Sequence, residues 1–215
     1  MTRIALIHAL AHSVAPINTA LARDWPEAVR MNLLDDSLSA DLAASGRGLD
    51  AAMHARFARL AQYAVDCGSQ GILFTCSAFG PCIEAVARQH APLPVLKPNE
   101  AMVVDAVALG GPIGLIASFA PTLQSMPPEF PAGTQLHTAL VAEALAALNA
   151  GDGARHDALV AEAGEQLRQQ GAQVIALAQF SMARARDRVA ARTGLPVLTT
   201  VDSAVRALRG RLAKI

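Results

Sequence analysis

The strongest potential nucleophiles in this sequence are the thiols of three cysteines, Cys67, Cys76 and Cys82. They are an odd number and form no Cys-x-x-Cys pair, which argues against a disulfide scaffold and against a zinc site. Reduced thiols are typical of a reducing compartment, so we expect a cytoplasmic protein. The chemistry to look for is that of a single thiol, which can add to a substrate or transfer a proton.

Cys76 has the most suitable sequence context of the three. It lies in the segment 74–81, where an apolar run stops at a polar loop and Pro81 is suited to the first turn of a helix. Amides at a helix start lower the pKa of a nearby thiol, so we predict a reactive Cys76 with a lowered pKa. The alternative is a buried, inert cysteine. We adopt that alternative for Cys67, near a helix end, and for Cys82, inside a helix.

Composition excludes several classes of protein. Eighteen basic and 18 acidic residues give a formal net charge of zero, so we expect no attraction to nucleic acid or to an anionic membrane. The chain is 53% hydrophobic and 17% charged, which excludes disorder and supplies a core. No Walker loop, GxGxxG or GxSxG motif occurs. Lys97 and Lys214 are poor candidates for a pyridoxal phosphate Schiff base.

Two apolar segments could be mistaken for export or membrane signals. The run after Met1 is interrupted at His8 and reads better as a buried first strand than as a signal peptide. The uncharged stretch 106–128 is long enough to cross a bilayer, but its glycines and prolines divide it into a helix end, a turn, a strand and a loop.

Short apolar runs alternate with longer alanine-rich helical stretches, the pattern of parallel strands joined by helices. The fold class is therefore α/β. We expect strands at 3–9, 29–33, 71–75, 95–96, 113–117, 135–137, 174–178 and 197–199. The clearest expected helices are 49–67, 81–90, 99–109, 138–149, 155–170 and 181–193.

The second half of the chain repeats the first. Three blocks recur in the same order, 4–7 with 113–116, 68–72 with 171–175, and 93–96 with 195–198. Alanine-rich α/β sequences also align with themselves by chance, but three blocks in one order favour a true repeat. We expect two pseudo-symmetric lobes, each a short, mostly parallel sheet flanked by helices.

The first lobe would comprise residues 1–97 and the second residues 98–201, with a final helix at 202–215 packing back on the first lobe. Loops after corresponding strands would then face each other across one cleft. This arrangement places the loop 75–77 opposite the loop 178–181.

With these motifs the sequence resembles the aspartate/glutamate racemase superfamily, which includes hydantoin racemases, maleate isomerases and arylmalonate decarboxylases. The resemblance covers nearly the whole chain. It rests on Thr75-Cys76-Ser77 after a strand, on Leu93-Pro94-Val95, and on the stretch 114–118 followed by Thr122. The stretch 32–38 resembles a less characterised branch. The resemblance implies two lobes around a small carboxylate substrate, one cysteine from each lobe, and neither cofactor nor metal.

Position 179 departs from the family pattern. The repeat and the motif both place Gln179 where the resemblance implies the second cysteine. Glutamine cannot ionise, so a two-thiol racemisation needs Ser181, a histidine or water to supply the second proton. What remains is one thiol, able to add to an activated double bond or to protonate one face of a carbanion.

The resemblance also implies a set of residues that hold the substrate. Ser77 and the amides after Cys76 match one carboxylate clamp, while Ser118 and Thr122 match the other, with Ser13 as their counterpart in the first lobe. Thr75, Phe180 and Ser181 flank the two central positions and complete the expected binding set.

Two histidines lie at the end of the first expected strand. Either His8 or His12 could lower the pKa of Cys76 or carry a proton. A strand-end histidine can also be no more than a hydrogen-bonded polar group. We name His12, together with Cys76 and Gln179, as the catalytic candidates.

Three functions stay open at this point. The first is a cofactor-independent racemase or isomerase acting on an amino acid, a hydantoin or a dicarboxylate through Cys76. The second is an arylmalonate-type decarboxylase, which needs only one proton donor. The third is a non-catalytic carboxylate-binding protein, which has no reason to keep a reactive Cys76. We expect a small carboxylate as the partner, no nucleic acid or membrane, and a homo-oligomer.

Overall fold

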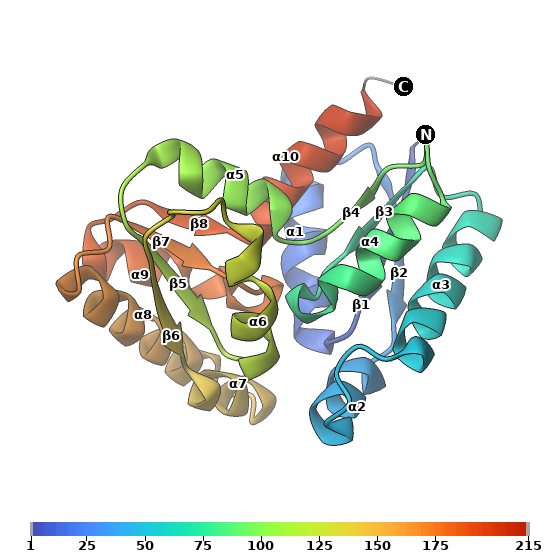
Figure 1. The fold of residues 1–215 in the computed structure, drawn as a ribbon. Helices are drawn as coiled ribbons and strands as arrows, with labels where there is room; N and C mark the ends of the chain where they lie inside the picture. The colour runs from blue at the N-terminus through green and yellow to red at the C-terminus, as the bar shows by residue number, and fades with distance from the viewer. Residues whose placement is uncertain (1, 214–215) are drawn as a thin grey trace.

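The structure is a computed structural model that describes residues 2–213. Within them, two four-stranded parallel sheets have the orders β2-β1-β3-β4 and β6-β5-β7-β8, and the sheets lie side by side as two lobes (Figure 1). The strands are β1 (Arg3–His8), β2 (Val29–Leu34), β3 (Gly71–Phe74), β4 (Val95–Leu96), β5 (Ile113–Ala117), β6 (Leu136–Leu140), β7 (Val174–Leu177) and β8 (Val197–Thr199).

Helices connect and cover the strands. The α-helices are α1 (Val14–Asp24), α2 (Ser37–Ser45), α3 (Ala51–Asp66), α4 (Gly80–Gln89), α5 (Glu100–Leu109), α6 (Ala120–Ser125), α7 (Ala142–Asn149), α8 (Gly153–Gln169), α9 (Arg186–Thr193) and α10 (Thr200–Leu212). Short 3-10 helices are η1 (Ala11–Ser13), η2 (Ser77–Phe79), η3 (Pro127–Glu129) and η4 (Phe180–Ala185).

The two sheets match in strand order and in register. Ile4 pairs with Gly71 in the first sheet, and the aligned residues Ile113 and Val174 pair in the second. The three repeated blocks occupy β1 and β5, β3 and β7, and β4 and β8. The prediction of two pseudo-symmetric α/β lobes is confirmed.

A glycine opens the second repeated block in each lobe, and the backbone requires it. Gly68 and Gly171 follow α3 and α8 with φ values of 78° and 100°. Glycine adopts this left-handed region readily, whereas a Cβ atom makes it costly. Each glycine lets the chain leave its helix and turn into the central strand that follows.

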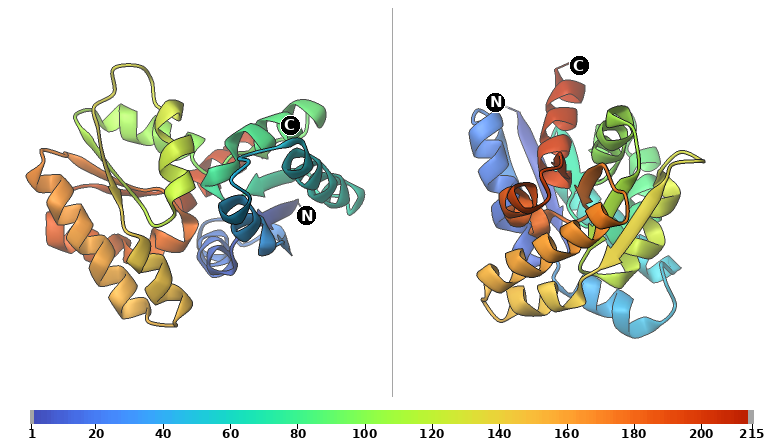
Figure 2. Two further views of the ribbon diagram at one scale, coloured as in Figure 1. Left: turned by 60° about the horizontal axis from the view of Figure 1, so that its bottom comes forward. Right: turned by 90° about the vertical axis from the view of Figure 1, so that its left-hand side faces the viewer.

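Each sheet is buried between two layers of helices (Figure 2). Side chains alternate along β1, so that Ile4 and Leu6 face α1 and α10 while Ala5 and Ile7 face α2, α3 and α4. The second sheet has the same layering, with α5 on one face and α7, α8 and α9 on the other. Burial on both faces explains why the central strands β1, β3, β5 and β7 read as continuous apolar runs, whereas the edge strands β2 and β6 contain exposed residues.

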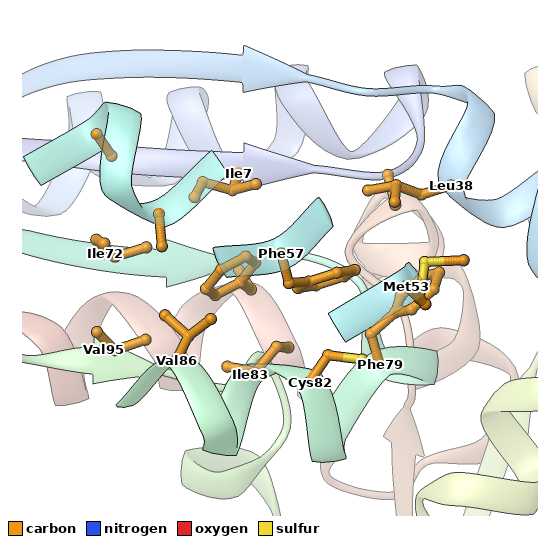
Figure 3. Close-up of a cluster of buried hydrophobic side chains, with 14 of the residues drawn as sticks. Ile7, Leu38, Met53, Phe57, Ile72, Phe79, Cys82, Ile83, Val86 and Val95 are labelled. Carbon is orange, nitrogen blue, oxygen red and sulfur yellow. The ribbon is translucent and has the colours of Figure 1, made fainter. Parts of the chain in front are cut away.

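The core on the α3 side of the first sheet is built around aromatic rings (Figure 3). The ring centroid of Phe57 lies 5.2 Å from that of Phe74 and 4.9 Å from that of Phe79. Cys82 is fully buried in the same cluster, as expected for an inert cysteine. This core fixes the strand β3 and the start of the loop that carries Cys76.

The last helix covers the first sheet rather than the second. Val201, Val205 and Leu208 of α10 pack with Ile4 and Leu6 of β1. The helix expected at 202–215 is observed from Thr200 to Leu212, and residues 214 and 215 lie outside the described residues. The division of the chain after residues 97 and 201 stays a prediction.

Two predicted helices begin too early. The segment 138–140 continues β6, because Thr138 pairs with Leu115 of β5, and α7 starts only at Ala142. The chain after β7 first forms η4, and the α-helix α9 begins at Arg186 rather than at Ser181. In both places pairing with the sheet or the loop after the strand overrides local helix propensity.

The uncharged stretch 106–128 contains the end of α5, then β5, α6 and the start of η3. Gly110 follows the end of α5 as predicted, but Gly114 lies inside β5, and Pro121 lies in the first turn of α6, where a loop was expected. Across residues 2–213, no helix combines the length and the apolar character that crossing a bilayer requires.

Replacing Gly114 by alanine tests the packing of the second lobe. The added Cβ would lie 2.9 Å from Cδ1 of Ile175 and 3.1 Å from the Cβ atoms of Ala172 and Leu167. We expect a loss of about 1–3 kcal/mol of unfolding free energy, measured by urea denaturation. Gly210→Ala on α10 is the control, because nothing lies within 4 Å of its Cβ position. Equal stability of the two variants would contradict the packing described.

Candidate active site

A cavity of about 270 Å³ lies between the lobes, beyond the carboxyl ends of β1, β3 and β7. The first lobe lines it with Leu10, Ser13, Asp36, Ser39, Ala40, Ala43, Thr75, Cys76 and Ser77, and the second with Phe119, Leu145, Asn149, Gln179 and Ser181. The loops after β3 and β7 therefore meet at one cavity, as the sequence repeat predicts.

Cys76 occupies the turn between β3 and η2. Its backbone is extended, and the Ala78 amide donates toward the sulfur. The Sγ atom lies 4.0 Å from Oγ of Ser39. Although Cys76 is partly exposed, burial of the sulfur is the dominant influence and raises the pKa of the thiol, with the Ala78 amide and Ser39 acting in the opposite direction. The prediction of a lowered pKa is wrong, because desolvation outweighs the amides at the helix start.

The raised pKa defines the resting state of the site. At neutral pH the Cys76 side chain is a protonated thiol. Oγ of Ser39 donates to the carbonyl oxygen of Ala9 at 3.0 Å, and it can turn this hydrogen to Sγ of Cys76, 4.0 Å away, once the thiol has lost its proton. As a protonated thiol Cys76 is a proton donor, and it becomes a base only after losing that proton.

Gln179 faces the same cavity from the second lobe and is held by Ser118. Its Oε1 accepts from the backbone N–H of Ser118 at 2.6 Å and from Oγ of Ser118 at 3.1 Å. A backbone N–H can only donate, so the oxygen of the amide must point toward Ser118. The amide NH2 group is left for the cavity, where it can donate to a carboxylate but cannot move a proton.

Ser77 and Thr122 join the lobes beside the thiol. Their hydroxyl oxygens lie 3.1 Å apart, and Oγ of Ser125 donates to the carbonyl oxygen of Ser77 at 3.1 Å. Ser118 and Thr122 do not themselves line the cavity. The structure therefore corrects their predicted direct contact with substrate: Ser118 positions Gln179, and Thr122 positions Ser77.

Two further sequence candidates point elsewhere. Phe180 is fully buried in the core beside Leu6 and Val201, so the prediction that it contacts substrate is wrong. His12 lines a different cavity, and its Nε2 lies 2.9 Å from Oδ1 of Asn149. The structure thus separates His12 from the cavity that contains Cys76.

His8 lies behind the loop of Cys76 and holds Thr75. Its Nε2 donates to Oδ1 of Asn32 at 3.0 Å, so its Nδ1 accepts from Oγ1 of Thr75 at 2.9 Å. Burial lowers the pKa of His8, and the contact with Asn32 counteracts this only in part. A neutral His8 supplies no charge to stabilise a thiolate at Cys76.

Sequence reasoning missed Asp36, Ser39 and Asn149, all of which line the cavity. Asp36 lies in the stretch 32–38, which resembles a racemase-like branch, so that motif offered a signal. Ser39 and Asn149 stand in no motif and reach the cavity through the packing of α2 and α7. Among residues 2–213, no three His, Cys, Asp or Glu side chains gather as metal ligands.

Thiol labelling across pH tests the described environment. We expect iodoacetamide to label Cys76 at a rate that still rises with pH above about 9, because its pKa is raised above the ordinary thiol value. Cys82 should resist, since it is fully buried and burial raises its pKa to about 11. Peptide mapping identifies the labelled thiol. A Cys76 rate that levels off below about pH 8 would show a lowered pKa instead.

Comparison with known proteins agrees with this architecture. The family model described as Asp/Glu/Hydantoin racemase matches residues 11–208. A search of curated protein sequences finds no match. A glutamate racemase isoform from Bacillus anthracis superposes with a TM-score of 0.78 at 12% identity, covering 99% of this chain and 82% of that one.

Two other solved structures share the fold. Allantoin racemase from Klebsiella pneumoniae has a TM-score of 0.74 at 16% identity, covering 99% of this chain and 88% of that one. Aspartate racemase from Picrophilus torridus has a TM-score of 0.73 at 11% identity, covering 100% and 94%. Since the family model spans most of the sequence, the chain belongs to the Asp/Glu/hydantoin racemase family and is an isomerase of the racemase class.

Proposed function

We propose that the chain is a racemase or isomerase that acts on a small carboxylic acid through Cys76 and without a cofactor. The substrate class is an amino acid, a hydantoin or a dicarboxylate. The observation that carries the proposal is the meeting of the Cys76 thiol and the Gln179 amide at one inter-lobe cavity. Similarity to glutamate, allantoin and aspartate racemases supports the same substrate classes.

The cavity offers hydrogen-bond donors suited to a carboxylate. The NH2 group of Gln179 comes from one lobe, and the hydroxyls of Ser13 and Ser77 come from the other. Charge-assisted bonds of this kind orient a substrate as well as bind it. At about 270 Å³ the cavity is near the lower end of ligand pockets, which favours a small acid.

The proton chemistry is unequal on the two sides of the cavity. Racemisation removes a proton from one face of a carbon and returns one to the other. The first lobe supplies Cys76 and the carboxylate of Asp36, while the second supplies Gln179, Asn149 and Ser181, none of which ionises near neutral pH. We infer that Cys76 first releases its proton to solvent, then takes the substrate proton on its own face and returns one after exchange with solvent, while water serves the opposite face more slowly.

Decarboxylation is the second candidate function. A carbanion formed by loss of carbon dioxide needs only one proton donor. The protonated resting state of Cys76, and a described cavity lining that holds no other thiol, favour this reaction. Proton delivery from one face would give a single product enantiomer.

Incubation in deuterated water distinguishes these functions. Amino acids, hydantoins, maleate and substituted malonates would each be incubated with the protein and followed by NMR. We expect at least one acid to exchange its α-proton for deuterium, with Cys76→Ala abolishing the exchange. Loss of carbon dioxide without exchange would instead support the decarboxylase. No reaction with any of them would contradict an enzyme of either kind and support a carboxylate-binding protein.

A further inference from the structure

A second cavity, of about 540 Å³, lies in the same inter-lobe cleft and is not used by the proposed reaction. It is lined from α1, from η4 and the start of α9, and from α10. Its volume is within the range of pockets that hold small organic ligands.

The lining of this cavity shares only Ser181 with the lining of the cavity that contains Cys76. Within η1 and its flanks, Ala11 and His12 face the larger cavity, whereas Leu10 and Ser13 face the thiol cavity. The contact between His12 and Asn149 connects the two linings, and Ser181 borders both cavities. A ligand in the larger cavity would therefore occupy a site of its own.

The larger cavity has an electropositive end. The first turns of α9 and α10 line this end, but the N–H of Arg186 is bonded to the carbonyl oxygen of Ala183 and that of Asp202 to Oγ1 of Thr199. The positive charge therefore comes from arginine side chains. Arg23, Arg184 and Arg186 line it against Asp187 and Asp202, which leaves the lining with one net positive charge.

The guanidinium groups of Arg184 and Arg186 have N–H donors that are not used within residues 2–213 and could bind a ligand. Arg186 approaches Asp202 through Nη1 alone, at 3.4 Å. Arg184 uses Nε for Asp157 at 2.9 Å, and its two terminal nitrogens make no further bond to the described residues. Arg23 is already bonded to Asp24 and Asp202, so it serves as a fixed charge. Arg186 is the best placed of the three to bind an anion.

A buried hydroxyl in the wall gives an independent indication of a ligand. Ser181 is 1% exposed, and its Oγ has no hydrogen-bond partner within residues 2–213. A buried hydroxyl without a partner costs free energy, and a ligand oxygen in the cavity would satisfy it. The wall also contains apolar side chains, among them Ala15, Pro16, Leu148 and Val201, together with the polar His12 and Thr19.

We propose that the larger cavity is a binding site for a small organic anion, a phosphate ester or a carboxylate with an apolar body. The anionic group binds Arg186 and the hydroxyl of Ser181, and the apolar body packs against α1. The site lies beside the thiol cavity but does not depend on the reaction proposed for Cys76.

Isothermal titration calorimetry with the full chain tests this site, using phenyl phosphate and phenylacetate as probes. We expect at least one to bind, and the tighter one identifies the anionic group. Arg186→Gln should weaken its binding at least about tenfold, the effect of losing one charge-assisted hydrogen bond. Arg188→Gln is the matched control, because Arg188 is exposed on the same helix, donates to the carbonyl oxygen of Ala154 and does not line the cavity.

Labelling of Cys76 by iodoacetamide shows whether the probe binds in the larger cavity or in the cavity of the proposed reaction. Saturation with the bound probe should leave the labelling rate unchanged, and Cys76→Ala should bind the probe as the wild type does. Absence of binding by both probes overturns the proposal. Equal weakening by the two arginine variants, or protection of Cys76 by the probe, overturns it as well.

Discussion

Cys76→Ser should lower turnover by about 1000-fold or more, because a positioned proton-transfer group contributes typically about 10²–10⁴ in rate. Serine is close to cysteine in size, so it preserves the contacts with Ser39 and Ala78 while replacing a thiol by a hydroxyl that does not ionise in the working range. The measurement is kcat/KM for the acid that shows proton exchange in deuterated water.

The control for this variant is Cys67→Ser, at the end of α3 and outside the cavity lining. It should keep turnover within about twofold of wild type, since surface substitutions rarely disturb a distant site. Urea denaturation should show both variants folded. If Cys76→Ser retains a tenth or more of wild-type turnover, the thiol is not the proton carrier.

Gln179→Cys should raise racemisation of that acid by at least about tenfold. The substitution places a second thiol on the face opposite Cys76, as an inversion with two acid-base groups requires. The gain should disappear when Cys76→Ala is added. Chiral chromatography of the product measures it directly.

Gln179→Cys also lowers the stability of the protein, and a second variant distinguishes this loss of stability from the change in activity. Ser118 is buried and loses the acceptor for its backbone N–H, which costs about 1–3 kcal/mol of stability. Gln179→Ser removes the same amide without adding a thiol, so it should show that cost and no gain in racemisation. Rapid racemisation by wild type, unchanged in Gln179→Cys and in Cys76→Ala, would contradict the match of Gln179 to the second cysteine.

The sequence predicted the strands and their repetition in two lobes well because the central strands of both sheets are buried on two faces. Strands in that position must be short apolar runs, and their repetition in one order gave the equivalence of β1 with β5 and of β3 with β7. Glycines at matching helix ends strengthened the alignment of the two halves, since Gly68 and Gly171 both adopt a positive φ angle. These are local constraints, and a sequence records them directly.

Side-chain direction after the strands was predicted less well, although part of it follows from backbone geometry. Gln179 has an extended backbone, so neighbouring side chains point to opposite sides. Gln179 and Ser181 reach the cavity, and Phe180 between them enters the core. The extended backbone at Gln179 could have separated Phe180 from the binding set, but Ser181 lies in the 3-10 helix η4, where alternation does not apply.

The electrostatic state of the thiol was beyond the reach of a sequence argument. The motif correctly predicted Cys76 at the start of a helix. Its pKa, however, depends on whether burial or hydrogen bonds to the sulfur dominate, and this depends on how α2 covers the loop. Ser39 and Asn149 likewise come from elements distant along the chain. Such contacts are fixed by tertiary packing, for which a single sequence carries no signal.

The most direct test of one-thiol chemistry is the stereochemical course of α-proton exchange by the wild type. A pure enantiomer of the responsive acid would be incubated in deuterated water, with deuterium content and configuration followed together. The account predicts deuterium uptake faster than inversion for the enantiomer whose proton faces Cys76, and loss of that uptake in Cys76→Ala. Inversion as fast as uptake from both enantiomers, or uptake that persists in Cys76→Ala, would contradict it.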